Sequence, residues 1–472
     1  MTAAQQDDRL QTEMAVLEAE LSKFDFVQFT IPDIHGIPRG RLVPTDMISE
    51  ACRDGVGLCA AQVTYPDYGT TNLTDFARLV WFGVRGELPY MIPEYTVYPN
   101  GNLHPLPATC RPLAWCSAPN RRIGHVMCQM EVKGEILEAC PRRAAQRQLD
   151  RLHKMGLKMK SAFEMEFMVF ESKTMEPLGG RVIPLANMEI LDRNLEFYTD
   201  MYRALSDSGV SMEYLFPEYE PGQFEVSMKP VFGMKSVDDA FLFRYGVRAF
   251  SNRRGYTTTF MGRPFYDYHT SGLHFNHSLW TKDDQDVFFD ASDPLKLSGL
   301  ARHWIAGLLE HAPAIAALTC PTINCYHRLH EGFAPGKIYW NEDDRLCTFR
   351  AKTNQTGAYL ENRIPSSACN PYLVLAATIA AGLDGVERKL ACPPPGPSGK
   401  SEPEGLPRSL GDALDVLEKD VVLKTSLGNK LVDDYIAIKR EFEVKPFESC
   451  TLDGISEAER IVKEREYYLP MM

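Results

Sequence analysis

Two glutamates, Glu164 and Glu166, lie two positions apart in the apolar segment Ser161–Phe170. The segment is short, rich in apolar residues and ends in a Val–Phe pair, and this pattern predicts a β-strand. Because residues two apart share one face of a strand, the two carboxylates should point in the same direction. Taken alone, such a pair is more often the solvated face of an amphipathic strand than a functional site.

Other segments repeat this placement of metal-seeking or anion-seeking groups on one face of an extended chain. Carboxylates and an imidazole that converge on one sheet would repel one another and lose their hydration unless a cation lay between them. Oxygen-rich ligands with a single imidazole suit Mg²⁺ or Mn²⁺ better than Zn²⁺. The segments are Ser271–Trp280 with His274 and Asn276, Gly357–Arg363 with Glu361, and the turn-containing Pro217–Val226 with Glu218 and Glu225.

Composition limits the classes of function. The 472 residues can form two or three ordinary domains, or one large domain with a smaller one. A formal net charge of −12 argues against a nucleic-acid partner and against docking on anionic membranes. No apolar run approaches the length of a membrane-spanning helix, and the first residues lack the features of a signal peptide. Twelve cysteines without a C-x-x-C pair are typical of reduced, mostly buried thiols, so we expect a cytoplasmic protein.

The first part of the chain predicts a small β-rich domain. Apolar residues recur at helical spacing from Leu10 to Leu21, which predicts a short amphipathic helix. Phe26–Ile31 and Arg39–Pro44 have the pattern of two strands that form a hairpin. Short strand patterns mixed with proline and glycine follow, and we place the end of this domain near residue 115.

Helices are predicted at three places in the remainder. Pro141 opens one helix and Gly156 closes it, because proline favours the first turn and glycine the end. Asn370 caps a second helix, apolar on all sides and therefore a core helix, which we expect to run to Gly382. The segment 410–468 has a helical, amphipathic pattern.

Four motifs in this order resemble the class I glutamine synthetases, and within that family most nearly the lengsin branch. The intervals between the motifs also match, and together they span about residues 160 to 390. One such motif would be weak evidence, whereas four in family order are strong. The motifs are Phe163–Phe167, Pro221–Val226, Ser271–His274, and Asn370–Leu373 with Ala381–Gly385.

The resemblance implies an α+β fold. Residues 1–115 would form a β-grasp-like N-terminal domain, and residues 116–472 a glutamine synthetase-type catalytic domain with a curved antiparallel sheet. Members of this family assemble into double-ring oligomers whose active sites are shared between neighbouring subunits, so we expect a homo-oligomer of ten or twelve subunits. The resemblance also implies ATP as a co-substrate, an amino acid and an amine as the other substrates, and two or more Mg²⁺ or Mn²⁺ ions.

The same resemblance implies a role for each candidate ligand. One ion would lie beside the amino-acid substrate, and a second would bridge the phosphates of the nucleotide. The first ion would be held by Glu166, Glu218 and Glu225, and the second by Glu164, His274 and Glu361.

Arginines would bind the anionic substrates. The resemblance places Arg328 and Arg363 on the substrate glutamate with Asn276 beside it, and Arg345 and Arg350 on the phosphates, with Arg328 and Arg345 contributing to catalysis. Chemistry supports these assignments independently, since activating a carboxylate with ATP brings two anions together and requires cations to screen them. Arginine suits the remaining oxygens because it is permanently charged and binds through two N–H groups.

The chain departs from the family where ammonia is captured. Ammonium-binding members carry an aspartate in a loop that corresponds here to Gly55–Gln62, which has no acidic residue. A flap glutamate of the family falls near Ala334, with Glu331 close by but out of register. Tyr359 replaces an arginine that helps to bind the nucleotide, and His269 replaces an asparagine in the substrate wall.

These departures leave three hypotheses. The first is an ATP- and Mg²⁺-dependent glutamate–amine ligase that acts through a γ-glutamyl phosphate and prefers an organic amine, with Leu58, Ala60 and Ala334 supplying an apolar amine pocket. The second is a catalytically silent structural oligomer like the vertebrate lengsins, which have lost several metal ligands that are all present here. The third is a sensor that binds metal and nucleotide without turnover. We favour the ligase because six intact ligands are hard to explain unless the chain still binds metal.

Overall fold

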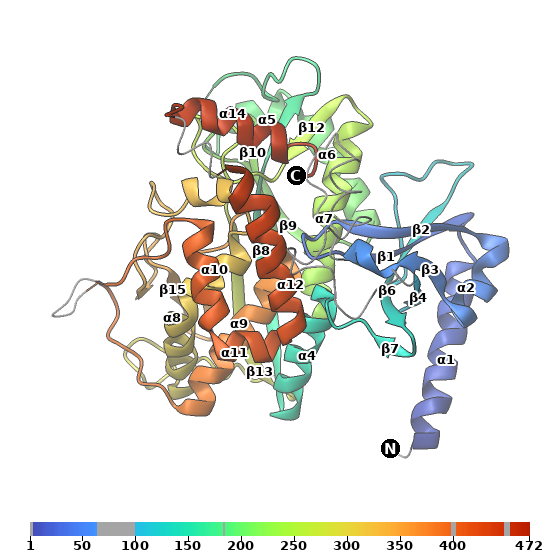
Figure 1. Ribbon diagram of the computed structural model, residues 1–472, viewed down its shortest axis with the longest axis horizontal. Helices are drawn as coiled ribbons and strands as arrows, with labels where there is room; N and C mark the ends of the chain where they lie inside the picture. Colours follow the sequence, from blue (N-terminus) through green and yellow to red (C-terminus); the bar gives the residue numbers. More distant parts are fainter. Residues whose placement is uncertain (1–2, 64–99, 183–184, 398–402, 448–453) are drawn as a thin grey trace, which may run out of the picture.

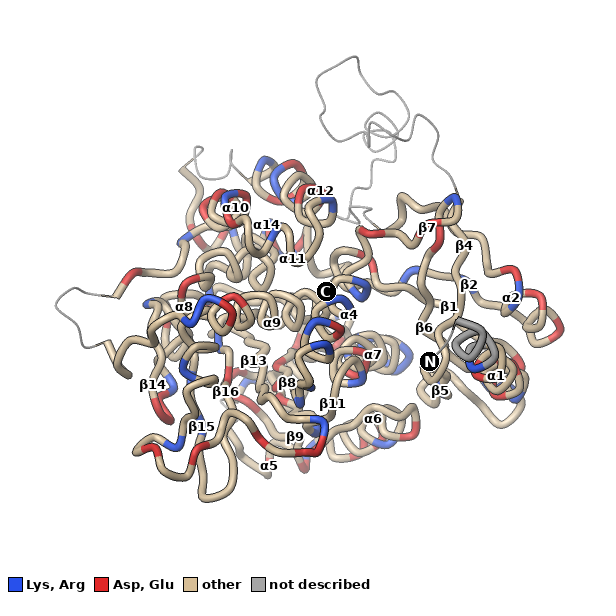
Figure 2. Tube along the Cα trace, turned by 90° about the horizontal axis from the view of Figure 1, so that it is seen from below, with Lys and Arg blue, Asp and Glu red and all other residues tan. Residues whose placement is uncertain are grey.

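The computed structural model describes residues 3–63, 100–182, 185–397, 403–447 and 454–472. The chain forms a small N-terminal β-domain beside a larger domain, the predicted catalytic domain, at the right and left of Figure 1. Seen from below in Figure 2, acidic and basic residues are interspersed along the described parts of both domains. None of the described helices is long and apolar enough to cross a membrane. The eleven described cysteines are all free, and seven of them are buried.

The N-terminal domain is built on a seven-stranded sheet whose central order is β2-β1-β6-β4-β3. Strands β1 and β2 form the predicted antiparallel hairpin. The predicted first helix is confirmed, and its residues Leu17 and Leu21 are buried against the sheet. The elements are α1 (Ala3–Leu21), β1 (Phe26–Pro32), β2 (Pro38–Pro44), η1 (Thr45–Met47), α2 (Ile48–Asp54), β3 (Val56–Cys59), η2 (Ala60–Val63), β4 (Asn100–Pro105), β5 (Arg111–Pro112), β6 (Ile123–Val132) and β7 (Glu135–Ile136).

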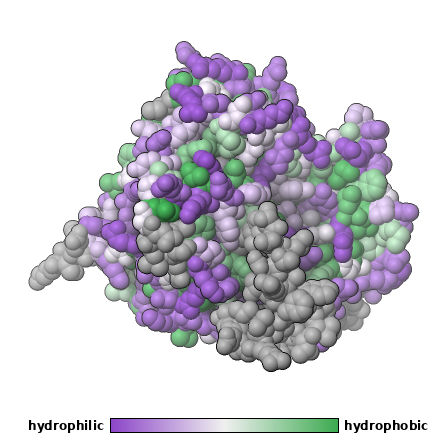
Figure 3. Space-filling model, turned by 45° about the horizontal axis from the view of Figure 1, so that its top comes forward, coloured by the Kyte–Doolittle hydropathy of each residue, from purple (hydrophilic) through white to green (hydrophobic). Residues whose placement is uncertain are grey.

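The N-terminal sheet continues past residue 115, the division predicted from the sequence. Strand β6 pairs in parallel with β1 and antiparallel with β4, and β7 pairs with β6. The sheet therefore ends only at Ile136, and we propose that the N-terminal domain extends to that residue. Figure 3 shows hydrophobic side chains on the surface of this domain, at the right of the view, and Leu42 on β2 is 56% exposed.

The catalytic domain contains a nine-stranded, mostly antiparallel sheet with the order β14-β15-β16-β13-β8-β10-β9. Strands β11 and β12 both pair with the long strand β8. The strands are β8 (Leu157–Glu171), β9 (Met212–Pro217), β10 (Gln223–Met228), β11 (Val231–Phe232), β12 (Tyr256–Thr259), β13 (Leu273–Thr281), β14 (Trp340–Glu342), β15 (Phe349–Thr353) and β16 (Ala358–Asn362).

Helices cover one face of this sheet and continue into the C-terminal part of the chain, as predicted for residues 410–468. The helical elements are α4 (Pro141–Lys154), α5 (Met188–Asp192), α6 (Leu195–Asp207), α7 (Met234–Asn252), α8 (Gly299–Thr319), η3 (Ile323–His327), α9 (Pro371–Arg388), α10 (Leu410–Lys419), α11 (Val421–Leu427), α12 (Asn429–Lys439), η4 (Arg440–Val444) and α14 (Glu457–Tyr468).

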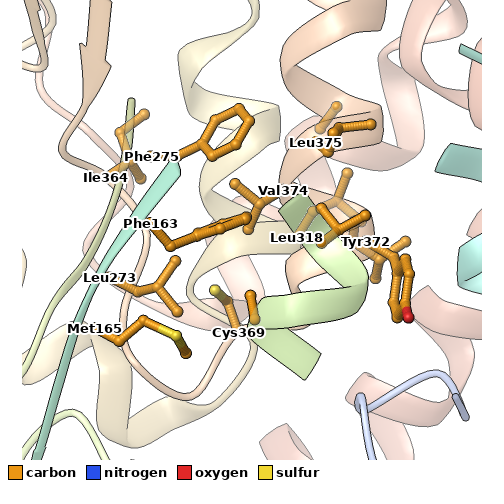
Figure 4. Packing of buried hydrophobic residues seen from close by; sticks show 14 of the residues in the cluster. Phe163, Met165, Leu273, Phe275, Leu318, Ile364, Cys369, Tyr372, Val374 and Leu375 are labelled. Atoms are coloured by element: carbon orange, nitrogen blue, oxygen red, sulfur yellow. The ribbon is translucent and has the colours of Figure 1, made fainter. Parts of the chain in front are cut away.

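Strand β8 separates the hydrophobic core from the site by simple alternation. Its residues Phe163 and Met165 are fully buried and face the helices α8 and α9, together with Leu273 and Phe275 of the paired strand β13 (Figure 4). Residues two apart share a face, so Glu164 and Glu166 lie on the opposite side of the strand. The predicted strand and its two-faced pattern are confirmed.

The two predicted helices of the catalytic domain are both present, but one is longer than expected. Helix α4 begins at Pro141 and ends before Gly156, as predicted. Helix α9 begins after the Asn370 cap and passes through Gly382, so the prediction that it stops there is wrong. A Cβ atom on Gly382 would lie 2.2 Å from the ring of Trp304 on α8. This glycine permits close helix packing and does not end the helix.

Candidate active site

Three predicted ligands meet where strands β8, β13 and β16 pair. His274 lies directly opposite Glu164, and Glu361 lies opposite Asn276. Nδ1 of His274 is 3.2 Å from Oε2 of Glu164 and 3.3 Å from Oε1 of Glu361. The amide of Asn276 donates a hydrogen bond of 3.0 Å to Oε1 of Glu164. Ligand atoms of the histidine and the two glutamates lie within 4.8 Å of one another, a spacing that could hold a metal ion.

Three buried arginines adjoin this group. Nη1 of Arg350 donates to Oε2 of Glu361 at 3.1 Å, and Nη1 of Arg363 donates to Oε1 at 2.6 Å. Arg328, which follows η3, donates to the backbone carbonyl of Arg363 at 3.0 Å. Its Nη2 also lies 3.4 Å from Nε2 of His274. The fold thus brings together cationic side chains from three separate segments beside the carboxylates.

The second group of predicted ligands lies on the next strands of the same sheet. Glu225 on β10 is paired in register with Glu166 on β8. Oε2 of Glu166 accepts hydrogen bonds from the backbone of Gly272 at 2.8 Å and from the amide of Gln223 at 3.3 Å. Glu218 lies in the turn after β9, and its charge acts on both of the other glutamates. Among the described residues, these three do not form as compact a group as the first set.

The carboxylates repel one another in the absence of a cation. Burial raises the pKa of Glu225 to about 9, and the charges of Glu166, Glu164 and Glu218 add to this effect. Burial, followed by the charge of Glu218, raises the pKa of Glu166 to about 7. For Glu164 burial is again the largest effect and opposes ionisation, but the contacts with His274, the hydrogen bond from Asn276 and the charge of Lys352 together outweigh it and lower the pKa. A divalent cation would relieve this repulsion and stabilise the ionised forms.

Several buried polar atoms of the site have no hydrogen-bond partner within the described chain. They are Nε of Arg350, Nε of Arg363 and Oδ1 of Asn276. Buried polar groups are almost always hydrogen-bonded, so these atoms indicate a ligand that would complete them. The arginine donors suit the oxygens of a phosphate or carboxylate, and the carboxylates with one imidazole suit Mg²⁺ or Mn²⁺. The residues present therefore fit both the ions and the anionic substrates that the sequence predicts.

Other predicted residues lie at the margin of the site. Arg345 is exposed in the turn between β14 and β15, and its positive charge acts on Glu218. The ammonium of Lys352 lies 5.4 Å from the ring centre of Tyr359. Glu331 is 3.5 Å from Nη1 of Arg263.

One pocket residue was predicted incorrectly. Leu58 is only 2% exposed and packs in the core of the N-terminal domain, so its side chain does not line an amine pocket. It occupies that position because strand β3 pairs with β4 and turns alternate side chains inward. Ala60, one position beyond β3, is half-buried at the edge of the same core.

The structure adds residues to the site that sequence reasoning missed. Gln223 bridges Glu166 and the carbonyl of Thr270, at 3.3 and 3.2 Å, and its place between the two glutamates of one motif was the available signal. Asp343 forms an ion pair with Arg350 from the turn beyond β14. No spacing in the sequence indicates this second contact, since it depends on how the turn folds back.

Replacing Glu225 with glutamine should stabilise the metal-free protein while removing the stabilisation that Mg²⁺ provides. The pKa of the Glu225 carboxyl is raised from its ordinary value of 4.5 to about 9 in the folded protein. Its contribution to the free energy of unfolding is therefore fully present below pH 4.5 and is lost as the pH rises from there to 9. The stability of the metal-free wild type relative to the variant should therefore fall by up to about 1.4 kcal/mol per pH unit. Urea unfolding at pH 5 and pH 8, with and without Mg²⁺, measures this difference, and equal pH slopes would contradict it.

Comparison with known proteins shows to which family this chain belongs. The family model described as the glutamine synthetase catalytic domain matches residues 138–454 of the sequence, which is more than half of the chain. The chain belongs to the glutamine synthetase family. It is 30% identical to human lengsin over 432 residues, which covers 89% of this chain and 80% of lengsin. It is also 30% identical to the glutamine synthetase of Thermotoga maritima over 451 residues, 90% of this chain and 94% of that enzyme.

Solved structures agree with this membership. A structure described as a novel glutamine synthase homolog has a TM-score of 0.77 and 27% identity, and the match covers 94% of this chain and 99% of that one. A second, described as a GmaS/ADP complex, has a TM-score of 0.77 over 95% of this chain and 98% of the other, and at 24% identity it shows the fold alone. The predicted family and fold class, an N-terminal β-domain followed by a glutamine synthetase catalytic domain with a curved sheet, are confirmed.

Proposed function

We propose that the protein is an ATP- and Mg²⁺-dependent glutamate–amine ligase that acts through a γ-glutamyl phosphate. The observation that carries the proposal is the set of four glutamates and one histidine on neighbouring strands of one sheet. Beside them lie two buried arginines, Arg350 and Arg363, whose Nε atoms have no hydrogen-bond partner among the described residues. Carboxylates that repel one another destabilise the fold, because each raised pKa lowers its stability at neutral pH. Metal binding explains why they are present, whereas a catalytically silent structural role does not. The sixth ligand, Glu218, lies in the adjoining turn.

The proposed roles are those that the family resemblance implies, and the positions of the side chains support them. By this resemblance Glu164, His274 and Glu361 would hold the ion beside the nucleotide phosphates, and they form the compact group of the site. Divalent ions bound there would screen the phosphate charges and keep the reacting groups in line. Arg350 would bind phosphate oxygens from its place beside Glu361, and Arg345 could reach them from its exposed turn.

The remaining residues would bind the acid substrate. Glu166, Glu218 and Glu225 would hold the ion on that side, and the buried Arg328 and Arg363 would bind its carboxylate. Catalysis of phosphoryl transfer depends on positioning and charge stabilisation more than on a protein nucleophile, which agrees with a site rich in fixed charges. We also propose a cytoplasmic homo-oligomer of ten or twelve subunits, whose exposed apolar residues, such as Leu42, would lie in subunit contacts.

An ADP-release assay with glutamate, ATP and Mg²⁺ tests the proposal, using ammonia, methylamine, ethanolamine and polyamines as acceptors. Amine-dependent ADP release from at least one acceptor is expected. If no acceptor stimulates ADP release although the protein binds Mg²⁺ and ADP, the sensor hypothesis replaces the ligase. If neither binding nor release is detected, the structural oligomer replaces both.

Ammonia should be a poorer substrate than a primary alkylamine. Ammonium must be held by an anion and lose a proton before it attacks, yet the segment Gly55–Gln62 has no acid, and Glu331 interacts with Arg263. An alkylamine has the same protonation requirement but gains about 0.8 kcal/mol per buried methylene. The measurement is kcat/KM for ammonia, methylamine and longer amines at one pH above 8. A tenfold preference for ammonia would contradict the prediction and make Glu331 the first residue to replace.

A further inference from the structure

Glu464, on helix α14 (Glu457–Tyr468), is a buried carboxylate outside the proposed active site. The helix lies at the top of Figure 1, in dark red. Glu464 is fully buried, although it is charged and far in sequence from every predicted ligand. Its carboxylate accepts hydrogen bonds from Asn324 at 2.8 Å and Arg460 at 3.0 Å, and it lies 3.0 Å from Nε2 of His327. Although burial opposes ionisation, these partners keep the pKa of Glu464 below its ordinary value.

One branch of this network leads to Arg328. His327 is the last residue of η3, and Arg328 directly follows it. The guanidinium of Arg328 donates to the carbonyls of Ile364 and Arg363 at 2.8 and 3.0 Å. Because Glu464 fixes His327, it also fixes the backbone from which the Arg328 side chain enters the site.

A second branch leads from Asn324 to the loop that begins at Arg263. Oδ1 of Asn324 accepts the backbone N–H of Arg263 at 2.8 Å, and its Nδ2 donates to the backbone carbonyl of Arg263 at 2.8 Å. The guanidinium of Arg263 in turn donates to the carbonyls of Tyr268 at 3.1 Å and Tyr266 at 2.8 Å. This loop continues to Gly272, whose N–H donates to Glu166.

The residues after α14 add a further link to the same loop. The backbone N–H of Phe260 donates to the carbonyl of Met472 at 2.9 Å, and the guanidinium of Arg248 donates to the carbonyl of Pro470 at 3.0 Å. Phe260 lies three residues before Arg263, and Oε1 of Glu457 lies 3.4 Å from Nη1 of Arg263, so the segment 457–472 contacts the start of the loop as well as its arginine.

We infer that Glu464 is a positioning residue for the acid-substrate site, because this buried carboxylate ties helix α14, through His327 and Asn324, to both the Arg328 segment and the loop 263–272. Glu457 of the same helix adds only longer, half-exposed contacts to Arg263 and His327, at 3.4 and 3.6 Å. What the site binds rests on the proposed function, whereas the mechanical link does not. Glu464 would act through Arg328 and Gly272 and would not touch the substrate. Among the described residues, Glu361 is linked to this network only beyond Arg328, through His274 and Arg363, so nucleotide binding should change much less than binding of the acid substrate.

Three variants test the inference. Glu464→Ala removes the network, Glu464→Gln preserves the volume and the bond from Asn324 but loses the charge, and Glu466→Gln changes an exposed residue of the same helix as a control. Amide hydrogen exchange should accelerate in residues 260–272 and 323–334 of the alanine variant, less so in the glutamine variant, and not in the control. Strands β8 and β13 should exchange as in the wild type. Acceleration confined to α14, or spread over β8 and β13, would show a merely structural role and overturn the inference.

Steady-state kinetics supply the second readout. The alanine variant should raise KM for glutamate about tenfold while KM for ATP stays within about twofold of the wild type. The glutamine variant, which tolerates the buried position better, should lie between the two. Equal changes in both KM values, or none, would contradict the positioning role. If the wild type releases no ADP, the proposed function fails, but hydrogen exchange still decides whether Glu464 positions the two segments.

Discussion

Replacing Glu361 with glutamine is expected to weaken binding of Mg²⁺ with ADP by about a hundredfold or more, because the ion loses a charged ligand. Glu361 is buried, contributes one ligand atom to the compact group with Glu164 and His274, and accepts hydrogen bonds from two buried arginines. Breaking a buried ion pair by removing one partner typically costs about 3–5 kcal/mol, so the variant should also unfold at a lower temperature. Isothermal titration calorimetry with ADP and Mg²⁺ measures the affinity.

A matched control separates loss of the ligand from loss of a negative charge near the site. Glu342 lies at the end of β14 on the same sheet and is exposed, so Glu342→Gln removes one carboxylate without removing a proposed ligand. This variant should bind Mg²⁺ with ADP like the wild type. If Glu361→Gln binds as tightly as the control, the compact group is not the nucleotide-metal site.

Glu166→Gln should have the opposite signature, with nucleotide binding preserved and turnover reduced about a hundredfold to a thousandfold. Glutamine can still accept the hydrogen bonds that Glu166 receives from Gly272 and Gln223, so the loop should keep its place. What the substitution removes is the charge that would hold the ion beside the acid substrate. Calorimetry with ADP and single-turnover kinetics with glutamate measure the two quantities. Parallel loss of nucleotide binding and turnover would contradict the assignment of Glu166 to a separate ion.

The elements that could be predicted from the sequence are those set by local physics. Alternation along Ser161–Phe170 predicted a strand with Glu164 and Glu166 on one face, and the capping residues Pro141 and Asn370 marked two helix starts correctly. These features depend on neighbouring residues only, so periodicity and capping rules suffice to find them.

The features that were missed depend on contacts between distant segments. Strand β6 extends the N-terminal sheet because it pairs with β1, about a hundred residues earlier, and no local pattern fixes that pairing. Gly382 is interior to a helix because Trp304 packs against it. In the sequence Glu464 is one of several charged residues of an amphipathic helix. Its burial depends on the fold, which places it against Asn324.

For the candidate site, the sequence names residues but not their arrangement. Spacing and resemblance named the ligands, whereas the register that sets His274 opposite Glu164, and Glu225 opposite Glu166, appears only in the sheet. The division into a compact group and a more open group is likewise a property of the fold. Of these two groups, only the compact group brings its ligand atoms close enough to hold an ion without a change in the positions of its side chains.

The chain is 30% identical both to human lengsin and to a glutamine synthetase, so family membership alone does not decide whether it catalyses a reaction. That must be measured. The most direct test uses glutamate labelled with ¹⁸O in its γ-carboxylate, together with ATP, Mg²⁺ and the best acceptor amine. A γ-glutamyl phosphate intermediate transfers one labelled oxygen to phosphate for each ADP released, because the amine displaces the phosphate with that oxygen attached. We expect one ¹⁸O per phosphate. Release of ADP with unlabelled phosphate would show hydrolysis of ATP by water and contradict the proposed ligase.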